Sequence, residues 1–324
     1  MQRTHFLKLQ PLLLLVVACS VACPPPVRFT PPPATATAEE VALAGASVLI
    51  GAGDIATCPS QGDDNTARLV DSVLKADSVA GVSDAVFAAG DIVYPSGRTV
   101  DFERCWKPSW GSPERRIMKK IMPVPGNHEY DTPGASGYYA YFGERAGPPD
   151  KGYYAYNLGA WRIYALNSEI PRNRRFTAAD RKAQEDWLRK DMEDNKEKRC
   201  MAAYWHHPRF SSSYHGSDPD LLSLFNVFYE GNGDVVMVGH DHTYERFAPQ
   251  NPVGVLDTLR GIAQIVVGTG GADLRGFRAA ARNSMSRVEG YYGVLKLTLG
   301  AGEYQHAFLD TRGRIWDPGK GKCH

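Results

Sequence analysis

The chain has 324 residues, of which 43% are hydrophobic, and its formal net charge at pH 7 is +1. This is the composition of a globular protein with room for one large domain or two small ones. A near-zero net charge gives no electrostatic reason to expect a nucleic-acid partner, so a nucleic-acid-binding function is disfavoured.

The first 23 residues have the pattern of an export signal. A basic start precedes an apolar run that ends at Ala18 and is too short to span a membrane stably. The run Val-Val-Ala-Cys that ends at Cys19 also resembles a bacterial lipobox, which favours a lipoprotein tethered to a membrane through Cys19. The alternatives are a lipobox at Cys23 and ordinary cleavage after Ala18 or Ala22, which would leave a secreted protein.

Residues 24–43 contain two proline triplets and alternating alanine and threonine, with no apolar period. Such a composition predicts a stiff, extended spacer between the signal and a folded domain. The apolar patterning begins after this segment, so we expect one folded domain over residues 44–324. That domain shows no internal repeat.

Four further cysteines follow the spacer, and export would place them in an oxidising compartment. Four cysteines allow three pairings. We favour Cys58 with Cys105 and Cys200 with Cys323, because the first two follow neighbouring loops that carry polar motifs. Four unpaired thiols are the alternative. A cysteine metal site is disfavoured, since no two of these cysteines stand at C-x-x-C spacing.

Apolar strands and a helix alternate at the start of the domain. Short apolar runs predict strands at residues 47–53, 84–90 and 121–125, and apolar residues at helical spacing predict a helix over residues 65–80. Strand, helix and strand with continuously apolar strands form a βαβ unit in a sheet covered on both faces.

The rest of the domain continues as an α/β pattern and ends in strands. In chain order it predicts a hairpin (153–157 and 161–167), a helix (177–194), a strand (200–205), a helix (220–229) and a strand (234–238). We expect Trp187, Leu188 and Met192 to face inward on the first of these helices. Three later runs alternate more and predict closing antiparallel, half-exposed strands: 263–267, 292–299 and 303–309.

Five short polar segments each follow an apolar run. They are Gly53-Asp54, Gly90-Asp91-Ile92-Val93-Tyr94, Gly126-Asn127-His128-Glu129, His206-His207-Pro208 and Gly239-His240-Asp241-His242. In open α/β sheets ligands lie off the carboxyl ends of strands, so we expect the five to gather at one edge. Each alone is a common turn, but together they supply carboxylates, an amide, a phenol and imidazoles. This set suits two adjacent metal ions, which most often hydrolyse phosphate esters.

The residue types also bear on the metals. A carboxylate can bridge two ions about 3.5–4 Å apart, and Asp91 is the natural bridge. Imidazole suits zinc, iron or copper, whereas oxygen ligands suit harder ions. A phenolate from Tyr94 would favour iron(III), because a hard anion stabilises high charge. If Tyr94 instead packs against the sheet, a plain binuclear zinc or manganese site remains.

The five segments resemble the motifs of the calcineurin-like metallophosphoesterases in order, spacing and residue type. Within that family, the tyrosine at the end of Gly-Asp-Ile-Val-Tyr is similar to the pattern of the purple acid phosphatases. The resemblance covers residues 48–246 and implies a four-layer α/β/β/α sandwich. One position departs from it: Ala56 stands where the purple acid phosphatase pattern has glycine and where ordinary calcineurin-like enzymes have a metal-binding histidine. This absence favours Tyr94 as the ligand.

The resemblance implies seven metal ligands: Asp54, Tyr94 and His242 on one ion, Asn127, His206 and His240 on the other, and Asp91 as the bridge. The ions would be iron(III) together with zinc, iron(II) or manganese. The H-x-P spacing selects His206 over its neighbour as the ligand.

The resemblance also implies the reaction. A hydroxide supplied by the metals would attack phosphorus, and His128 beside the substrate phosphate would donate to the leaving oxygen, so that Asp91 and His128 carry catalysis. His207 and His215 are candidate substrate contacts. Alternatively, His207 bonds nearby backbone and His215 is an exposed loop residue.

Three functions fit this pattern. The first is an exported phosphomonoesterase acting on a small phosphate ester, and the second is a phosphodiesterase acting on nucleotides or lipid head groups. The third is a non-catalytic surface binding protein, which the intact ligand set argues against. The sequence leaves the physiological substrate and the oligomeric state open.

Overall fold

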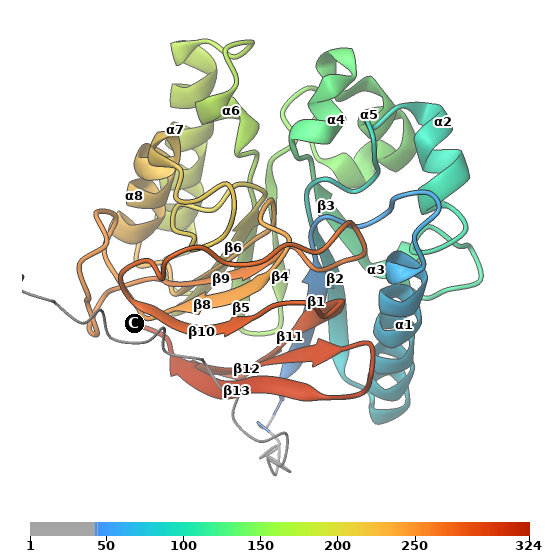
Figure 1. Ribbon diagram of the computed structural model, residues 1–324. Helices are drawn as coiled ribbons and strands as arrows, with labels where there is room; N and C mark the ends of the chain where they lie inside the picture. The colour runs from blue at the N-terminus through green and yellow to red at the C-terminus, as the bar shows by residue number, and fades with distance from the viewer. Residues whose placement is uncertain (1–42, 44) are drawn as a thin grey trace, which may run out of the picture. The chain divides into compact units, whose positions relative to one another are not determined.

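The structure is a computed structural model, and it describes residue 43 and residues 45–324 (Figure 1). The expected signal, including Cys19, and most of the expected spacer lie outside the described residues, so export and lipidation stay predictions. Within the described part of the chain, no helix is both long and apolar enough to cross a membrane.

Two β-sheets form the centre of the folded unit (Figure 1). The first has, in spatial order, β13 (Ile315–Lys322), β12 (Glu303–Asp310), β11 (Gly293–Leu299), β1 (Ser47–Ala52), β2 (Ser83–Ala89) and β3 (Ile121–Val124). The second has β10 (Ser284–Val288), β8 (Tyr244–Phe247), β9 (Ala263–Val267), β7 (Val235–Val238), β6 (Cys200–Trp205), β5 (Trp161–Ala165) and β4 (Tyr154–Leu158).

Aromatic side chains from the two sheets meet in the main hydrophobic core. The ring of Phe87 in β2 lies 5.6 Å from that of Tyr204 in β6, and Tyr244 in β8 stacks on Phe308 in β12 at 4.6 Å between centroids. All four side chains are buried. The sheets therefore pack face to face, and with helices on their outer faces the predicted four-layer sandwich is confirmed.

Helix α1 (Gly62–Ala80) connects β1 to β2, which pair in parallel, so the expected βαβ unit is present. It buries Val70 and Leu74, four residues apart on one face, against the core. The helix ends at Gly81, whose φ of 69° is the left-handed conformation that glycine adopts readily.

Helices α7 (Ala178–Asp194) and α8 (Leu222–Glu230) cover the outer face of the second sheet and share a second core with it. Thr177 caps α7 reciprocally, since its hydroxyl accepts from the Asp180 N–H and the Asp180 carboxylate accepts from the Thr177 N–H. Leu188 and Met192 are buried as expected, whereas Trp187 is only half-buried.

Shorter helical segments lie mainly at the strand ends that carry the motifs. They are α2 (Thr99–Asp101), a π-helical turn (Phe102–Trp106), α3 (Ile117–Lys120), α4 (Asn127–Asp131), α5 (Ser136–Phe142), α6 (Glu169–Arg172), and 3-10 turns at Pro133–Ala135, Gly143–Ala146 and Pro219–Leu221. The sequence pattern did not predict α2 to α6, because each is too short to show a helical period.

One strand differs in part from its prediction. β9 was expected to be antiparallel and half exposed. It pairs antiparallel with β8 as expected, but it also pairs in parallel with β7 and is buried throughout. The one polar side chain in this strand that hydrogen-bonds within the core is Gln264, whose buried amide accepts from the N–H groups of Arg209 and Phe210 and donates to the Phe210 carbonyl. β11 and β12 are antiparallel as expected.

Within residues 45–324 two disulfides form, and they are the pairs that the sequence favoured. Cys58–Cys105 joins the loop after β1 to the π-helical turn after β2. Cys200–Cys323 joins the start of β6 to the residue after β13, and so links the two sheets.

Candidate metal centre

All five motif segments lie at the carboxyl ends of parallel strands. Those of the first sheet follow β1, β2 and β3, and those of the second follow β6 and β7. Parallel strands direct their carboxyl ends to the same edge, so the polar side chains of both sheets converge there. The centre is therefore built from both halves of the sandwich.

Asp54, Tyr94 and His242 form one side of this centre. The Tyr94 hydroxyl lies 3.0 Å from Asp54 Oδ1 and 3.2 Å from His242 Nε2, and Asp54 Oδ1 lies 3.2 Å from the same nitrogen. Burial and the neighbouring carboxylates of Asp54 and Asp91 raise the pKa of Tyr94 well above its ordinary value. The phenol therefore keeps its proton here unless a strongly charged cation binds beside it.

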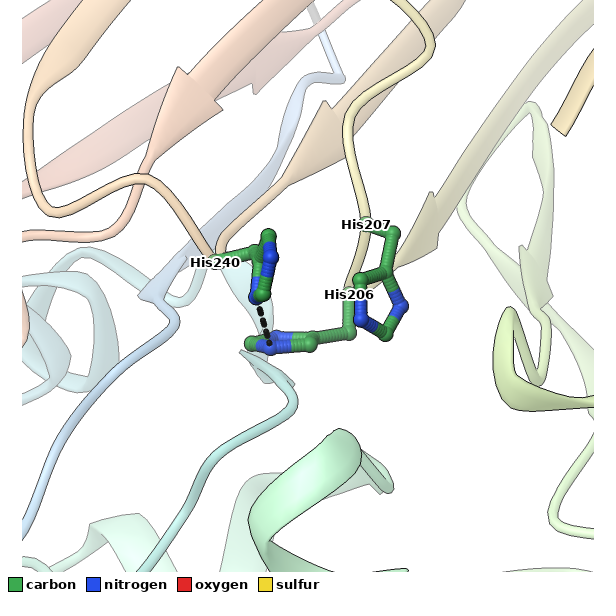
Figure 2. Close-up of side chains that lie close together, drawn as sticks. All are labelled: His206, His207 and His240. Atoms are coloured by element: carbon green, nitrogen blue, oxygen red, sulfur yellow. Dashed lines mark hydrogen bonds between the residues drawn. The ribbon is translucent and has the colours of Figure 1, made fainter. Parts of the chain in front are cut away.

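Asn127, His206 and His240 form the other side. His206 Nε2 lies 3.2 Å from Asn127 Oδ1 and 3.3 Å from His240 Nδ1. Figure 2 shows His206 and His240 reaching toward each other from the loops after β6 and β7, with His207 beside His206. The structure thus brings together the three residues expected on the second ion.

Asp91 lies between the two sides. Its Oδ2 is 3.2 Å from the Tyr94 hydroxyl on one side and 3.2 Å from His206 Nε2 on the other. Its second oxygen, Oδ1, accepts from the His128 N–H at 2.9 Å. This is the position that a bridging carboxylate needs.

The donor set fits metal cations because its lone pairs face one another. A backbone carbonyl only accepts, so the contacts of His206 Nδ1 with Ala89 O (2.9 Å) and of His242 Nδ1 with Asp273 O (2.5 Å) place the ring proton on Nδ1. Each Nε2 lone pair then points at a carboxylate oxygen. Without a positive charge between them these groups would repel one another.

The pKa shifts of His206 and Asp91 also indicate that positive charge is stabilised at this position. Burial by itself lowers the pKa of His206, but the Asp91 carboxylate outweighs burial and raises it to about 10. Burial opposes ionisation of Asp91, but the facing His206 imidazole outweighs burial and lowers the Asp91 pKa below its usual range. Electrostatics that favour a proton at this position also favour a metal ion. Ligand atoms of Asp54, Asp91 and His206 all lie within 4.8 Å of one another.

The backbone around the expected ligands is shaped to bring them together. Asp54, Asp91 and His240 have φ values of 57°, 46° and 68°, a left-handed conformation that costs roughly 1–3 kcal/mol for non-glycine residues. A Cβ on Gly126 would lie 2.3 Å from Asp91 Oδ1, and one on Gly239 would lie 2.5 Å from Asp54 Oδ2. These motif glycines are therefore required by close packing against the two carboxylates.

Glu129 ties two of the motif loops together. Its buried carboxylate accepts from the N–H groups of Ile92 (2.9 Å) and Val93 (3.2 Å) after β2, and from that of Gly126 (2.8 Å) after β3. Burial and the nearby Asp91 raise the pKa of Glu129 to about 7.

His128 lies at the edge of the centre. Its Nδ1 donates to Pro95 O at 2.5 Å, and its ring packs on that of Tyr94 at 4.4 Å between centroids. The side chain is 31% exposed and its Nε2 is 3.8 Å from Asp91 Oδ2. That nitrogen is left for a group outside the protein, as a substrate contact requires.

His215 occupies the corresponding place on the opposite side. Its ring stacks on His240 at 4.2 Å between centroids, its Nδ1 lies 3.0 Å from Asp241 Oδ1, and its side chain is 32% exposed. The sequence missed Asp241, which stands between the two histidines of Gly-His-Asp-His. Its buried carboxylate also accepts from the His215 N–H and from the Ser211 hydroxyl.

His207 does not lie where the sequence reading placed it. Its ring is fully buried; Nδ1 bonds to the Ser168 hydroxyl at 2.9 Å and Nε2 accepts from Arg172 Nη1 at 2.7 Å. Both ring nitrogens thus pair with side chains and not with backbone, and the buried ring presents no exposed face to a substrate. It packs instead against His206 and His240, at 4.7 and 4.4 Å between centroids, and supports them.

The sequence model of the calcineurin-like phosphoesterase family matches residues 49–244. This range begins within β1 and ends at the first residue of β8, so it contains all five motif segments. No curated protein matches the chain.

Several solved structures share the fold. The purple acid phosphatase PPD1 from yellow lupin (Lupinus luteus) seeds has a TM-score of 0.68 at 21% identity, over 86% of this chain and 54% of that one. The chain thus spans about half the length of the lupin enzyme. GAP50, the anchor in the inner membrane complex of Plasmodium, has a TM-score of 0.68 at 12% identity, over 86% and 89%. A dimetal phosphatase from Danio rerio has a TM-score of 0.52 at 13% identity, over 86% and 99%.

Proposed function

Because the chain belongs to the calcineurin-like phosphoesterase family, we propose that it is an exported, binuclear-metal phosphomonoesterase of the purple acid phosphatase type. The observation that carries the proposal is the convergence of lone pairs from Asp54, Asp91, His206 and His242 on one centre. Tyr94, Asn127 and His240 complete the set of residues that would hold the ions.

The reaction needs both the ions and the protein. Two cations in such a centre neutralise charge on phosphate oxygens and make water a stronger nucleophile at neutral pH. His128 and His215 would bind the phosphate from opposite sides, since each ring is half exposed and has its Nδ1 committed to the protein. The Nε2–H of His128 would donate to the leaving oxygen as its bond to phosphorus breaks.

Export is supported by two features of the chain. The amino-terminal residues have the composition of a signal, and the folded unit forms two disulfides, which persist in oxidising compartments. Tethering through Cys19 remains part of the same proposal.

The first test compares hydrolysis of an aryl phosphate monoester with that of its bis-aryl diester by the metal-loaded protein. We expect clear preference for the monoester. Preference for the diester would replace the phosphatase with a phosphodiesterase that uses the same residues. Failure to cleave either ester would contradict phosphoester hydrolysis.

The second test concerns the role of Tyr94. If its phenolate binds iron(III), the purified protein has a visible charge-transfer band, and Tyr94→Phe removes it. Tyr244→Phe is the matched control, because the Tyr244 hydroxyl is also bonded to a carboxylate, that of Asp317. A colourless, active, iron-free enzyme would instead indicate a zinc or manganese centre.

A further inference from the structure

We propose that Tyr214, Arg275 and Arg278 form a recognition cluster for a second anionic group on the substrate. The inference rests on the proposed function, because it concerns the part of a phosphate ester that lies beyond the reacting phosphate. The substrates it selects are esters that carry another phosphate.

Contacts lead from a metal ligand outward to this recognition cluster. His215 stacks on the ligand His240, and Tyr214 packs edge-on against His215 at 5.4 Å between centroids. On the other side, the Arg275 N–H donates to the His242 carbonyl at 3.1 Å. The recognition cluster is therefore anchored to both histidines of the Gly-His-Asp-His segment.

Both arginines lie against the same tyrosine ring. The guanidinium carbon of Arg278 is 4.7 Å from the Tyr214 ring centroid, and that of Arg275 is 5.3 Å away. Tyr214 is 53% exposed, and both arginines are exposed as well. Among the described residues no carboxylate forms an ion pair with either guanidinium, so their hydrogen-bond donors are available to a ligand.

Backbone contacts join the loop that carries Tyr214 to the loop that carries Arg275 and Arg278. Ser213 and Phe277 form an antiparallel bridge, and the Arg278 N–H donates to the Ser212 carbonyl at 2.8 Å. The Ser213 hydroxyl donates to the Gly276 carbonyl at 3.1 Å. The arginines thus start from a fixed backbone, which reduces the entropy lost on binding.

The chemistry of the recognition cluster points to phosphate. A guanidinium offers a planar fork of donors that matches phosphate oxygens in pairs. Two such groups stand side by side on a chain whose net charge is only +1. Because they contact Tyr214 beyond His215, they meet a substrate away from the reacting phosphate. The guanidiniums lie on the tyrosine ring, so charge recognition, more than base stacking, is the function that the geometry supports.

The test measures preference for a second phosphate. We would compare kcat/KM for fructose 1,6-bisphosphate with that for fructose 6-phosphate, and for adenosine 3′,5′-bisphosphate with that for adenosine 5′-monophosphate. The wild-type protein should prefer the bisphosphate in both pairs. In Arg275→Gln/Arg278→Gln this preference should fall roughly tenfold, the range expected for two partly exposed charged contacts.

The chain contains a matched control. Arg312 and Arg314 lie over the Tyr291 ring at 5.0 and 5.6 Å, on the turn between β12 and β13. Arg312→Gln/Arg314→Gln removes the same charge from the same kind of arrangement and should leave the preference unchanged. Equal preference for the bisphosphates in the wild type and in the Arg275/Arg278 variant would overturn the inference. An equal loss of this preference in both double variants would also overturn it, because the effect would then be one of general charge.

Calorimetric binding separates this inference from the proposed function. If the protein cleaves none of the esters, the proposed function fails. Tighter binding of adenosine 3′,5′-bisphosphate than of the monophosphate, lost in Arg275→Gln/Arg278→Gln, would still support the recognition cluster. Equal binding of the two nucleotides would overturn it.

Discussion

At the scale of single residues, four of the imidazoles in and beside the centre are fixed in the same way. His128, His206, His215 and His242 each commit Nδ1 to a backbone carbonyl or a carboxylate and leave Nε2 for another partner. Fixing the tautomer in advance orients the ring and removes a reorganisation step when a ligand arrives. The division of roles then follows from burial, since His206 and His242 are buried while the other two are half exposed.

Asp91→Asn tests the bridge. The substitution removes the charge that faces both sides of the centre and leaves the size of the side chain nearly unchanged, so we expect activity to be lost and metal content to fall. Metal content is measured by elemental analysis and activity with the aryl monoester. Asp186→Asn, the same change on an exposed face of α7, should alter neither. Retained metal and near-normal turnover would reject the binuclear assignment.

The sequence analysis correctly predicted that most residues of the centre lie close together, because the carboxyl ends of parallel strands in α/β sheets converge. Asp54, Asp91 and His206 are predictable on this ground alone. Glu129 and Asp241 were not, because their partners are backbone N–H groups and loop side chains that only the fold places beside them. His207 was misplaced because adjacent positions at a strand end point to opposite sides, and sequence alone does not show which side is filled.

At the scale of elements, Glu129→Gln tests the tie between the loops after β2 and β3. The amide would set an NH2 group against a buried N–H group, which costs about 1–3 kcal/mol of unfolding free energy. Metal affinity should fall roughly 10–100-fold, as for other residues that support ligands. Urea unfolding and metal titration measure the two effects.

Glu245→Gln is the control for this change. Glu245 is a buried carboxylate that accepts from the Ser212 N–H and from the hydroxyls of Ser212 and Ser284. Its loss should cost stability without a comparable loss of metal affinity. If both variants bind metal equally well, Glu129 is only a stabilising residue.

His306 in β12 predicts a pH dependence of stability. Burial and the nearby Arg246 lower its pKa from 6.5 to about 4. The unfolded chain takes up this proton below about pH 6.5 and the folded chain does not, so the free energy of unfolding falls as pH drops from 6.5 to 4. The loss approaches about 3 kcal/mol. Urea unfolding at several pH values should show a flatter dependence for His306→Gln, and parallel curves would contradict the assignment.

The elements that the sequence missed have local reasons. β13 contains Pro318, Gly319 and Gly321, which argue against a strand in a sequence-based prediction. It is nevertheless an edge strand, where such residues are tolerated. β8 directly follows the ligand loop that carries His242, so its four residues read as part of a motif. Buried strands such as β1 and β6 were predictable because each is a continuous apolar run.

At the scale of the whole folded unit, the two disulfides should have different effects. Cys200–Cys323 closes a separation of 123 residues and links the sheets, so the double serine variant should lose roughly 3–5 kcal/mol of stability. Cys58–Cys105 links the loop that carries Asp54 to the π-helical turn that follows the Asp91 loop, and its removal should also weaken metal binding.

Thermal unfolding and metal titration of the two double serine variants separate these effects. Loss of metal affinity in the Cys58/Cys105 variant alone is the expected outcome. Equal affinity in both variants would show that this disulfide does not position the ligand loops.

The four-layer architecture could be predicted because the motif order belongs to a family with one fold. The pairing of strands at the ends of the two sheets could not, since β8, β10 and β13 depend on contacts between distant segments. β10, for example, pairs with β8 across a bulge between Ser284 and Ser286. Such long-range pairing leaves no local period in the sequence.

The residues that would hold the ions come from both sheets, and this has a consequence for how long the folded protein survives. A cation held at the centre is a cross-link between the two halves of the core, and it binds the folded chain in preference to the unfolded one. Each tenfold rise in metal above the dissociation constant then adds about 1.4 kcal/mol to the free energy of unfolding. Proteases cut chains that open, so molecules in metal-poor surroundings would be cleared sooner. The amount of enzyme that survives would follow the metal supply before any substrate is met.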